Sequence, residues 1–380
     1  MKRRSTWAAL CLSLCLGAPM AQAGDQGITP DEIRLGASQV LTGPLGPQTV
    51  QYGVGARLLF DAVNASGGVH GRKITLTALD DGFDPARAQE NTRRLVEQDK
   101  VFLLFNSTGT AQTAAVLPYL KEHKTILFGP VTGASSLREN FNRLVFHVRA
   151  SYANESDKIV SQLKQIGVQR VAMAYQDDGF GRALLAEVRR AAAREQLSLA
   201  AEIKLDPAST DHKAAAEATA SAQPQAVIIG SAGATVPRYV RAVQATQARP
   251  MFYGFSVASP DVITRELKGK ARGIVLAQIM PSLRNHSIPV VVEYLRMLKE
   301  HDPAAVPSAS QFEGFVHARL LVEGLRRTGR DLSTENFIRT MQSAGEIAFG
   351  RFTARYAPAS HNGSDYVELA IIDGEGRLRY

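Results

Sequence analysis

The chain has 380 residues, of which 45% are hydrophobic and 21% are charged, and its formal net charge at neutral pH is +8. This length exceeds the roughly 250–300 residues at which a single hydrophobic core tends to divide, so we expect two lobes. Basic residues are scattered among acidic ones, without a block of like charge or a stripe of interleaved aromatic residues. This pattern argues against nucleic-acid binding and favours a solvated surface of mixed charge.

A secretory signal peptide is predicted at the start of the chain. The basic residues 2–4 precede an apolar run, 7–20, that is too short to span a bilayer. Ala21-Gln22-Ala23 then gives the small-x-small pattern after which a signal peptidase cuts. We therefore expect residues 1–23 to be removed and the mature protein to be soluble and exported to the periplasm of a Gram-negative bacterium.

Both cysteines of the chain, Cys11 and Cys15, lie inside this segment. Neither follows the small residue that a lipoprotein anchor site requires. The mature chain is therefore expected to lack thiol catalysis, thiolate metal sites and disulfides. No apolar stretch of about 18 residues follows residue 23, so no transmembrane helix is predicted.

From Ile33 onward, short β-rich runs alternate with longer stretches of helical spacing. The expected strands of the first part are 33–38, 74–79, 101–105 and 125–128, with helices at 50–65, 84–98 and 112–123. The second part has expected strands at 170–175, 199–205, 226–229, 251–253 and 273–280, with helices at 155–166, 182–195, 210–220 and 235–246. Three helices at 288–300, 310–327 and 333–343 and strands at 347–353 and 366–372 complete the chain. This alternation predicts parallel sheets covered by helices on both faces.

Several short motifs, in order along the chain, carry a resemblance to a known family. They are Thr-Gly-Pro-Leu-Gly at 42–46, Asn-Ala-Ser-Gly-Gly-Val-His-Gly-Arg at 64–72, Gly-Thr at 109–110, Gly-Pro-Val-Thr-Gly-Ala at 129–134, Arg-Ala-Ser-Tyr at 149–152, Asp-Asp-Gly-Phe-Gly at 177–181, Phe-Glu-Gly-Phe at 312–315 and His-Asn-Gly-Ser-Asp-Tyr at 361–366. In order and spacing they resemble the leucine/isoleucine/valine-binding protein family. Its members are the solute-binding components of ABC importers of the branched-chain-amino-acid type.

The resemblance implies the type I periplasmic binding fold, an α/β Venus-flytrap of two doubly wound parallel-sheet lobes joined by three crossing segments. The crossings are expected near 148–151, 278–282 and 355–362. The expected N-terminal lobe comprises 24–148 plus 281–357, and the C-terminal lobe 149–280 plus 358–380. In such sheets a ligand binds beyond the carboxyl ends of the strands, where helix N-termini offer unpaired N–H groups.

Two loops that follow buried strands are candidates for ligand binding. Ser107, Thr108 and Thr110 surround a glycine that lets the backbone approach a ligand, and they supply N–H and O–H donors. A simple helix cap is the alternative interpretation of this loop. The resemblance implies that a carboxylate clamp lies here and that residues 131–133, namely Val131, Thr132 and Gly133, form its second half.

The residues expected to line the rest of the site depart from those of amino-acid binders. The resemblance places Gln48 where the family has an aromatic residue, Phe180 at a second-lobe tyrosine position, and Ala232 or Gly233 at another. Tyr152, at the first crossing, could stack on a ligand ring or pack the hinge.

The acid that pairs with a ligand ammonium in leucine binders aligns with Ser256. Loss of that acid removes the natural counter-ion of a buried ammonium, and an unpaired buried charge is unfavourable. We therefore expect a ligand other than a plain aliphatic amino acid, such as an aromatic or other small carboxylate, or an amide. The alternative is that another acidic residue of the chain replaces the missing acid at this place in the folded protein.

Other motifs are better explained as structure. Residues 67–73 follow a helix rather than a strand, unlike a phosphate-binding loop. Asp80, Asp81 and Asp84 lack the spacing of a calcium loop, and the histidines lack paired metal-ligand spacing. We expect no metal, no cofactor and no enzymatic activity.

The resemblance thus implies a monomeric periplasmic solute-binding protein that closes on a small polar ligand and delivers it to an inner-membrane ABC permease. The small-ligand classes are an amino acid, an aromatic or other small carboxylate, or an amide. One alternative is a sensory binding protein whose closed form contacts a membrane receptor or kinase. A secreted hydrolase is another, although no recognisable pairing of Ser or Thr with His supports it.

Overall fold

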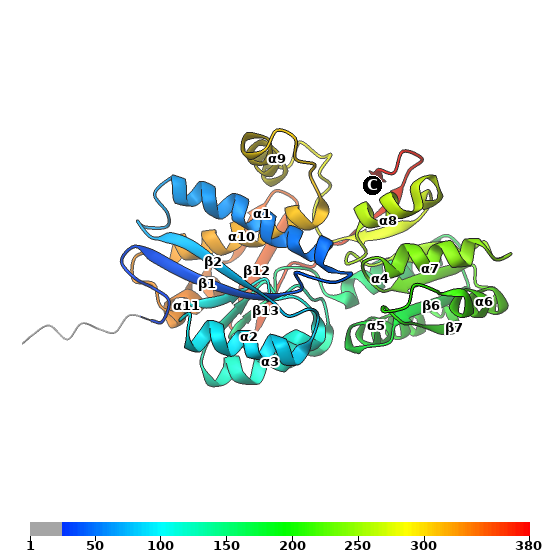
Figure 1. Cartoon of the computed structure of the whole chain (residues 1–380), viewed down its shortest axis with the longest axis horizontal. Helices are drawn as coiled ribbons and strands as arrows, with labels where there is room; N and C mark the ends of the chain where they lie inside the picture. Colours follow the sequence, from blue (N-terminus) through cyan, green and yellow to red (C-terminus); the bar gives the residue numbers. More distant parts are fainter. Residues whose placement is uncertain (1–24) are drawn as a thin grey trace, which may run out of the picture.

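The computed structural model describes residues 25–380 and shows two α/β lobes side by side (Figure 1). The predicted signal peptide, residues 1–23, lies outside the described residues. In the part of the chain that is described, no helix combines the length and the apolarity needed to cross a membrane.

The first lobe is built on a five-stranded parallel sheet of order β2-β1-β3-β4-β5. Its strands are β1 (Glu32–Gln39), β2 (Lys73–Asp80), β3 (Leu103–Phe105), β4 (Ile126–Phe128) and β5 (Val145–Phe146). Leu103 and Phe105 pack into the core on one face, and Leu104 packs into a second core on the other. Burial on both faces explains why this strand is apolar at every position.

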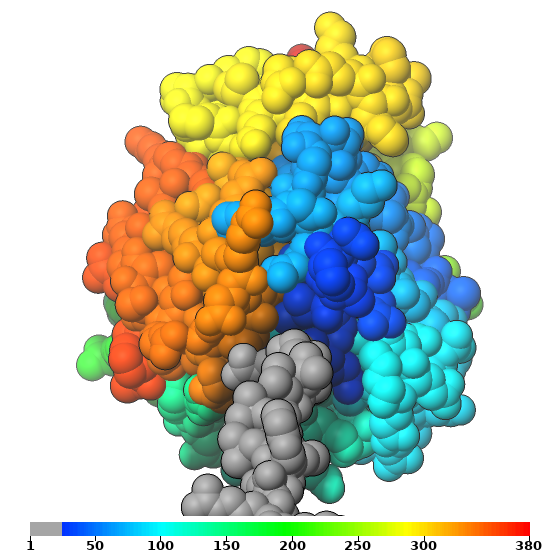
Figure 2. Space-filling view, turned by 90° about the vertical axis from the view of Figure 1, so that its left-hand side faces the viewer, coloured from blue at the N-terminus to red at the C-terminus, as the bar shows by residue number. Residues whose placement is uncertain are grey.

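Helices cover both faces of this sheet. The helices of the first lobe are α1 (Gly46–Ala65), α2 (Pro85–Glu97), α3 (Thr110–Glu122), α9 (Pro289–His301), α10 (Ala309–Thr328) and α11 (Thr334–Ser343), with a short 3-10 turn η1 (Ser135–Leu137). α1 and α10 belong to the core on one face, whereas α2 and α3 belong to the core on the other. Figure 2 shows the orange α10–α11 region directly against the blue α1 region, although they are far apart in the sequence.

Close packing of α1 against α10 depends on two glycines. A Cβ atom on Gly55 would lie 1.8 Å from the carbonyl oxygen of Gln311, and one on Gly314 would lie 2.0 Å from that of Tyr52. Only glycine allows the two backbones to approach this closely. The contact brings the first half of α1 beside Glu313, and both contribute to the site described below.

The second lobe is built on a seven-stranded sheet of order β15-β14-β10-β9-β8-β6-β7. Its strands are β6 (Arg170–Gln176), β7 (Ser198–Leu205), β8 (Ala226–Gly230), β9 (Met251–Gly254), β10 (Val275–Gln278), β14 (Glu368–Ile372) and β15 (Leu378–Arg379). Its helices are α4 (Tyr152–Gln165), α5 (Gly179–Glu195), α6 (Lys213–Ala222), α7 (Thr235–Gln244) and α8 (Pro260–Leu267), with a 3-10 turn η2 (Lys268–Ala271). β14 is antiparallel to β10, while β6 to β10 pair in parallel.

The predicted fold class, with two parallel-sheet α/β lobes, is confirmed. The region 347–353, predicted as one strand, is instead two: β11 (Glu346–Phe349) and β12 (Phe352–Ala357) form a hairpin around Gly350, whose φ is +80°. A third strand, β13 (Ser360–Gly363), pairs with β12. The bounds of the two lobes stay a prediction, and this pairing favours a third passage between the lobes at 364–367.

Candidate functional site

A small cavity lies between the lobes, with walls supplied by both. Its volume is about 50 Å³, whereas a cavity that holds benzene has about 150 Å³. The lining residues are Leu45, Gln48, Thr49, Tyr52, Phe83, Thr108, Gly109, Thr110, Val131, Tyr152, Phe180, Ala232 and Val257. The lobes are therefore drawn together in this structure, and admission of a ligand requires them or their side chains to separate.

A hydrogen bond joins the lobes directly at this cavity. Gln48 Nε2, from the first turn of α1, donates to the carbonyl oxygen of Val257 at 2.9 Å. Val257 follows β9 in the second lobe. Both residues are buried, so the bond belongs to the closed arrangement of the lobes.

The two candidate loops of the first lobe run side by side. Val131 N donates to the carbonyl oxygen of Ser107 at 2.9 Å, and the hydroxyls of Thr110 and Thr132 lie 2.8 Å apart in a hydrogen bond that either can donate. The N-cap of α3 is Gly109, which has a φ of +102° and no side chain to cap the helix. No side chain of the loop therefore caps this helix at its N-cap position. The first-turn N–H groups of α3 can instead serve an anionic ligand.

The structure brings six of the ten sequence-predicted residues together at the cavity wall, and four lie behind it. The six are Gln48, Thr108, Thr110, Val131, Tyr152 and Phe180. Of the others, Ser107 and Thr132 hold the two loops together, and the carbonyl oxygen of Gly133 accepts a hydrogen bond from Tyr152 N at 2.7 Å. Ser256 instead forms hydrogen bonds with Arg149 and Glu155. That these ten residues bind a ligand stays a prediction.

Charged residues that the sequence did not single out as site residues meet behind the cavity. Arg149, on the first passage between the lobes, is fully buried. Its guanidinium lies 4.0 Å from Glu155 of the second lobe and 3.6 Å from Glu313 of the first. Its Nη2 donates to Ser256 Oγ at 2.5 Å, and Ser256 in turn donates its N–H and hydroxyl to Glu155. We call Arg149, Glu155 and Glu313 the hinge triad.

Burial governs the protonation of the hinge triad. Removal from water raises the pKa of Glu155 and of Glu313, against the attraction of Arg149, and the charge of Glu313 adds to the rise at Glu155. On the next turn of α10, burial and the charge of Arg149 lower the pKa of His317 to about 3, so its imidazole is neutral at neutral pH. His317 Nδ1 lies 2.6 Å from Asn106 Oδ1. In the sequence, the signal that could have revealed the hinge triad was a charged residue, Arg149, within the otherwise largely apolar run 145–150.

We expect the unfolding temperature to depend on pH through Glu313. Its pKa is raised from 4.5 on folding, so the folded protein retains a proton that the unfolded chain releases. This stabilising contribution is complete below about pH 4.3 and is lost as the pH rises through the folded-state pKa. Glu313→Gln removes this titration. The unfolding temperature of the variant should therefore rise relative to that of the unmodified protein as the pH is raised from about 4 toward neutrality.

Scanning calorimetry across this pH range measures that difference. His317 and Arg149 are present in both proteins. Loss of Glu313 also lowers the pKa of Glu155, because the charge of Glu313 contributes to its rise, and this changes the unfolding temperature in the same direction. Glu300→Gln, in an exposed ion pair with Arg296, is the control and should show no such trend. A constant difference between the Glu313→Gln variant and the unmodified protein would contradict the prediction.

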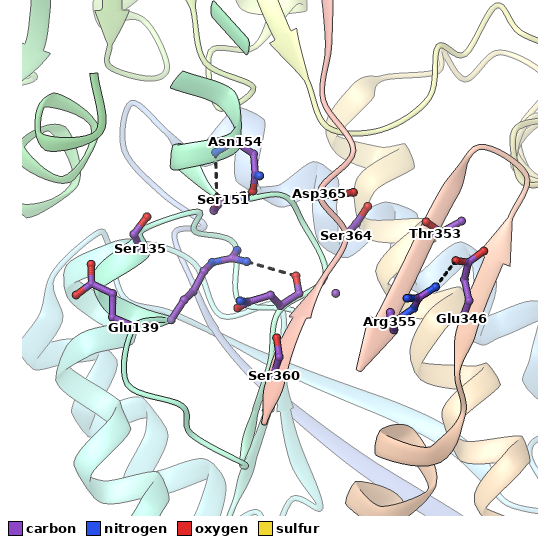
Figure 3. A pocket seen from close by; sticks show the side chains of 13 residues that line it. Ser135, Glu139, Ser151, Asn154, Glu346, Thr353, Arg355, Ser360, Ser364 and Asp365 are labelled. Atoms are coloured by element: carbon purple, nitrogen blue, oxygen red, sulfur yellow. Dashed lines mark hydrogen bonds and ion pairs between the residues drawn. The ribbon is translucent and has the colours of Figure 1, made fainter. Parts of the chain in front are cut away.

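A second, larger pocket opens on the hinge side and is drawn in Figure 3. It has a volume of about 680 Å³ and lies between η1, the start of α4, the third passage and the β11–β12 hairpin. Arg138 spans its inner wall, with Nη2 donating to the carbonyl oxygen of Arg149 at 3.1 Å and Nη1 to that of Asn362 at 3.4 Å. Burial and the charge of Arg149 lower the pKa of Arg138 to about 10.

The two pockets differ in chemistry. The hinge-side pocket is open and polar, and its charged residues include the ion pair of Arg355 with Glu346 at 3.0 Å. The interlobe cavity is lined by four aromatic rings, and none of its lining residues is charged. It also receives the loops that follow β3 and β4, where a ligand is expected in an open parallel sheet. We therefore take the interlobe cavity as the candidate ligand site.

Comparison with known proteins agrees with this arrangement. The family described as "Periplasmic binding protein" matches residues 32–375. A Pseudomonas aeruginosa protein named "Amino acid binding protein" is 27% identical over 158 residues, which cover 39% of this chain and 41% of that protein. The chain thus matches less than half the length of that curated relative.

Two solved structures are similar over nearly their whole length. One, from Rhodopirellula baltica, is described as "a possible leucine/isoleucine/valine-binding protein" and superposes with a TM-score of 0.87 at 25% identity, covering 92% of this chain and 97% of that one. The other, a substrate-binding periplasmic protein from Ralstonia solanacearum, has a TM-score of 0.85 and 29% identity, covering 91% and 99%. With the family match extending over most of its length, this chain belongs to the periplasmic binding protein family.

Proposed function

We propose that this protein is the solute-binding component of an ABC importer. After removal of residues 1–23 it would act in the periplasm as a monomer and deliver its ligand to an inner-membrane permease. The observation that carries the proposal is the interlobe cavity, to which both lobes contribute walls and a direct hydrogen bond. Such a site binds its ligand most tightly when the lobes are closed.

The lining of the cavity supports a small carboxylate as the ligand. The uncapped N-terminus of α3 and the hydroxyl of Thr110 can hold the carboxylate. The rings of Tyr52, Phe83, Tyr152 and Phe180 can pack against an apolar body, aromatic or branched. No lining residue offers a carboxylate to a ligand ammonium, and both acids of the hinge triad already face Arg149. We therefore favour an aromatic or other apolar carboxylate over leucine.

A thermal-shift screen tests this proposal, because a ligand that binds the folded state raises the unfolding temperature. The panel contains amino acids, aromatic acids, dicarboxylates and amides. We expect an aromatic or branched carboxylate without an ammonium group to raise the unfolding temperature more than leucine does. A response to leucine alone would contradict the ligand class that we favour, and hydrolysis of the ligand during incubation would contradict the role of a solute-binding protein.

Thr110→Val should then lower the affinity for the ligand so identified by about tenfold, the size of one lost hydrogen bond to a charged group. Thr132→Val should have a smaller effect in the same direction, since Thr132 acts through Thr110. Isothermal titration calorimetry measures both. The control is Thr92→Val, a buried threonine on α2 that does not line the cavity. Unchanged affinity in Thr110→Val would refute the placement of the carboxylate.

A further inference from the structure

The side-chain amide of Gln48 has a nitrogen that donates a hydrogen bond and an oxygen that has no partner. Its side chain lines the interlobe cavity and is only 7% exposed. A carbonyl oxygen can only accept, so the bond to Val257 fixes the amide with Nε2 toward the second lobe. The Oε1 atom, on the other arm of the amide, is buried and has no hydrogen-bond partner among the described residues, although the hydroxyl of Tyr52 lies beside the same amide.

A buried acceptor without a partner is unfavourable, and in a binding cavity it indicates a donor on the ligand. Most of the cavity wall is apolar, and Leu45, Phe180 and Val257 belong to it together with Gln48. The few polar groups of a ligand site generally fix the orientation and identity of the ligand. Among the residues that line this cavity, Gln48 is the one whose side chain carries an amide.

The donor that suits Gln48 is uncharged. A ligand ammonium would need a counter-ion, and no acid lines the cavity. The carboxylates of Glu155 and Glu313 are fully or almost fully buried beside Arg149, which already balances part of their charge. A hydroxyl or an amide N–H donates to Oε1 without bringing a charge into the cavity.

We propose that Gln48 determines ligand specificity by accepting a hydrogen bond from a neutral donor, a hydroxyl or an N–H, on the apolar body of a small carboxylate. This inference rests on the proposed function. The same side chain would then have two tasks: Nε2 holds the second lobe closed, and Oε1 selects the ligand. A site that hydrogen-bonds a substituent discriminates strongly against an analogue without it, because its own polar group is left unpaired.

The test compares pairs of acids that differ by one hydroxyl. The probes are benzoate against 2-, 3- and 4-hydroxybenzoate, and phenylacetate against 4-hydroxyphenylacetate, titrated by calorimetry. At least one hydroxylated acid should bind about tenfold more tightly than its parent. In Gln48→Met and Gln48→Leu this ratio should fall to near one. Loss of the bond to Val257 weakens both members of a pair alike, so the ratio isolates the role of Oε1.

Gln51→Met is the matched control, since Gln51 lies one turn along α1, pairs with Gln311 at 2.7 Å and does not line the cavity. It should keep the ratio of the unmodified protein. Parent acids that bind as tightly as every hydroxylated acid, or a preference that survives in Gln48→Met, would overturn the assignment while the proposed function stands. If no acid of this panel binds, an aromatic carboxylate is not the ligand and the assignment to Gln48 is overturned, while the thermal-shift screen still decides whether a branched carboxylate binds.

Discussion

Replacing Arg149 by methionine is expected to destabilise the folded protein by about 3–5 kcal/mol, since removal of one partner from a buried ion cluster leaves the others uncompensated. Arg149 is fully buried and lies between Glu155 of one lobe and Glu313 of the other. Without the guanidinium, the two acids must become protonated or remain charged away from water. Urea denaturation followed by circular dichroism measures the change in the free energy of unfolding.

Two further variants separate the charge of Arg149 from its size. Arg149→Met combined with Glu155→Gln and Glu313→Gln should recover a large part of the lost stability, because a neutral cluster no longer contains an uncompensated charge. Arg143→Met removes the half-exposed ion pair with Glu335 at 2.6 Å and should cost at most about 1 kcal/mol. If Arg149→Met cost no more than Arg143→Met, the hinge triad would not have the energetic importance we assign to it.

Gly133→Ala is expected to lower the affinity for the bound ligand by about fivefold to 150-fold, equivalent to the ~1–3 kcal/mol typical of an overpacked site. A Cβ atom on Gly133 would lie 2.6 Å from the ring of Tyr152 and 2.8 Å from its backbone nitrogen. Tyr152 begins α4 in the second lobe and lines the cavity. The added methyl group therefore opposes the closed arrangement, while the loop at the start of α3 keeps its donors.

Small-angle X-ray scattering, together with calorimetry on the ligand found in the screen, measures this effect. At saturating ligand, the variant should retain a larger radius of gyration than the unmodified protein. Gly179→Ala is the control, since its Cβ would lie at an ordinary 3.6 Å from Ala111 across the same cleft. Equal affinity and equal compactness of the Gly133→Ala variant and the unmodified protein would show that this contact does not limit closure.

The sequence allowed the fold class, the family and most elements to be predicted, because these depend on local patterns and on motif order. The strand 74–79 was found as β2 (Lys73–Asp80), and the helix 310–327 as α10 (Ala309–Thr328). The helix α8 was missed although Ser259 caps it and Pro260 occupies its first turn. Those two residues are a recognisable start signal. The hairpin within 347–353 was missed because one glycine among strand-forming residues does not by itself identify a turn.

The two loops after β3 and β4 could be paired from the sequence, since neighbouring parallel strands end at the same edge of a sheet. Tertiary structure alone decided which polar atoms meet between the lobes. Gln48 and Val257 are 209 positions apart, and Ser256 contacts Glu155 from 101 positions away. Hydrophobic periodicity tells which face of an element is buried. It does not tell which distant side chain lies opposite, because that depends on how helices and lobes pack in three dimensions.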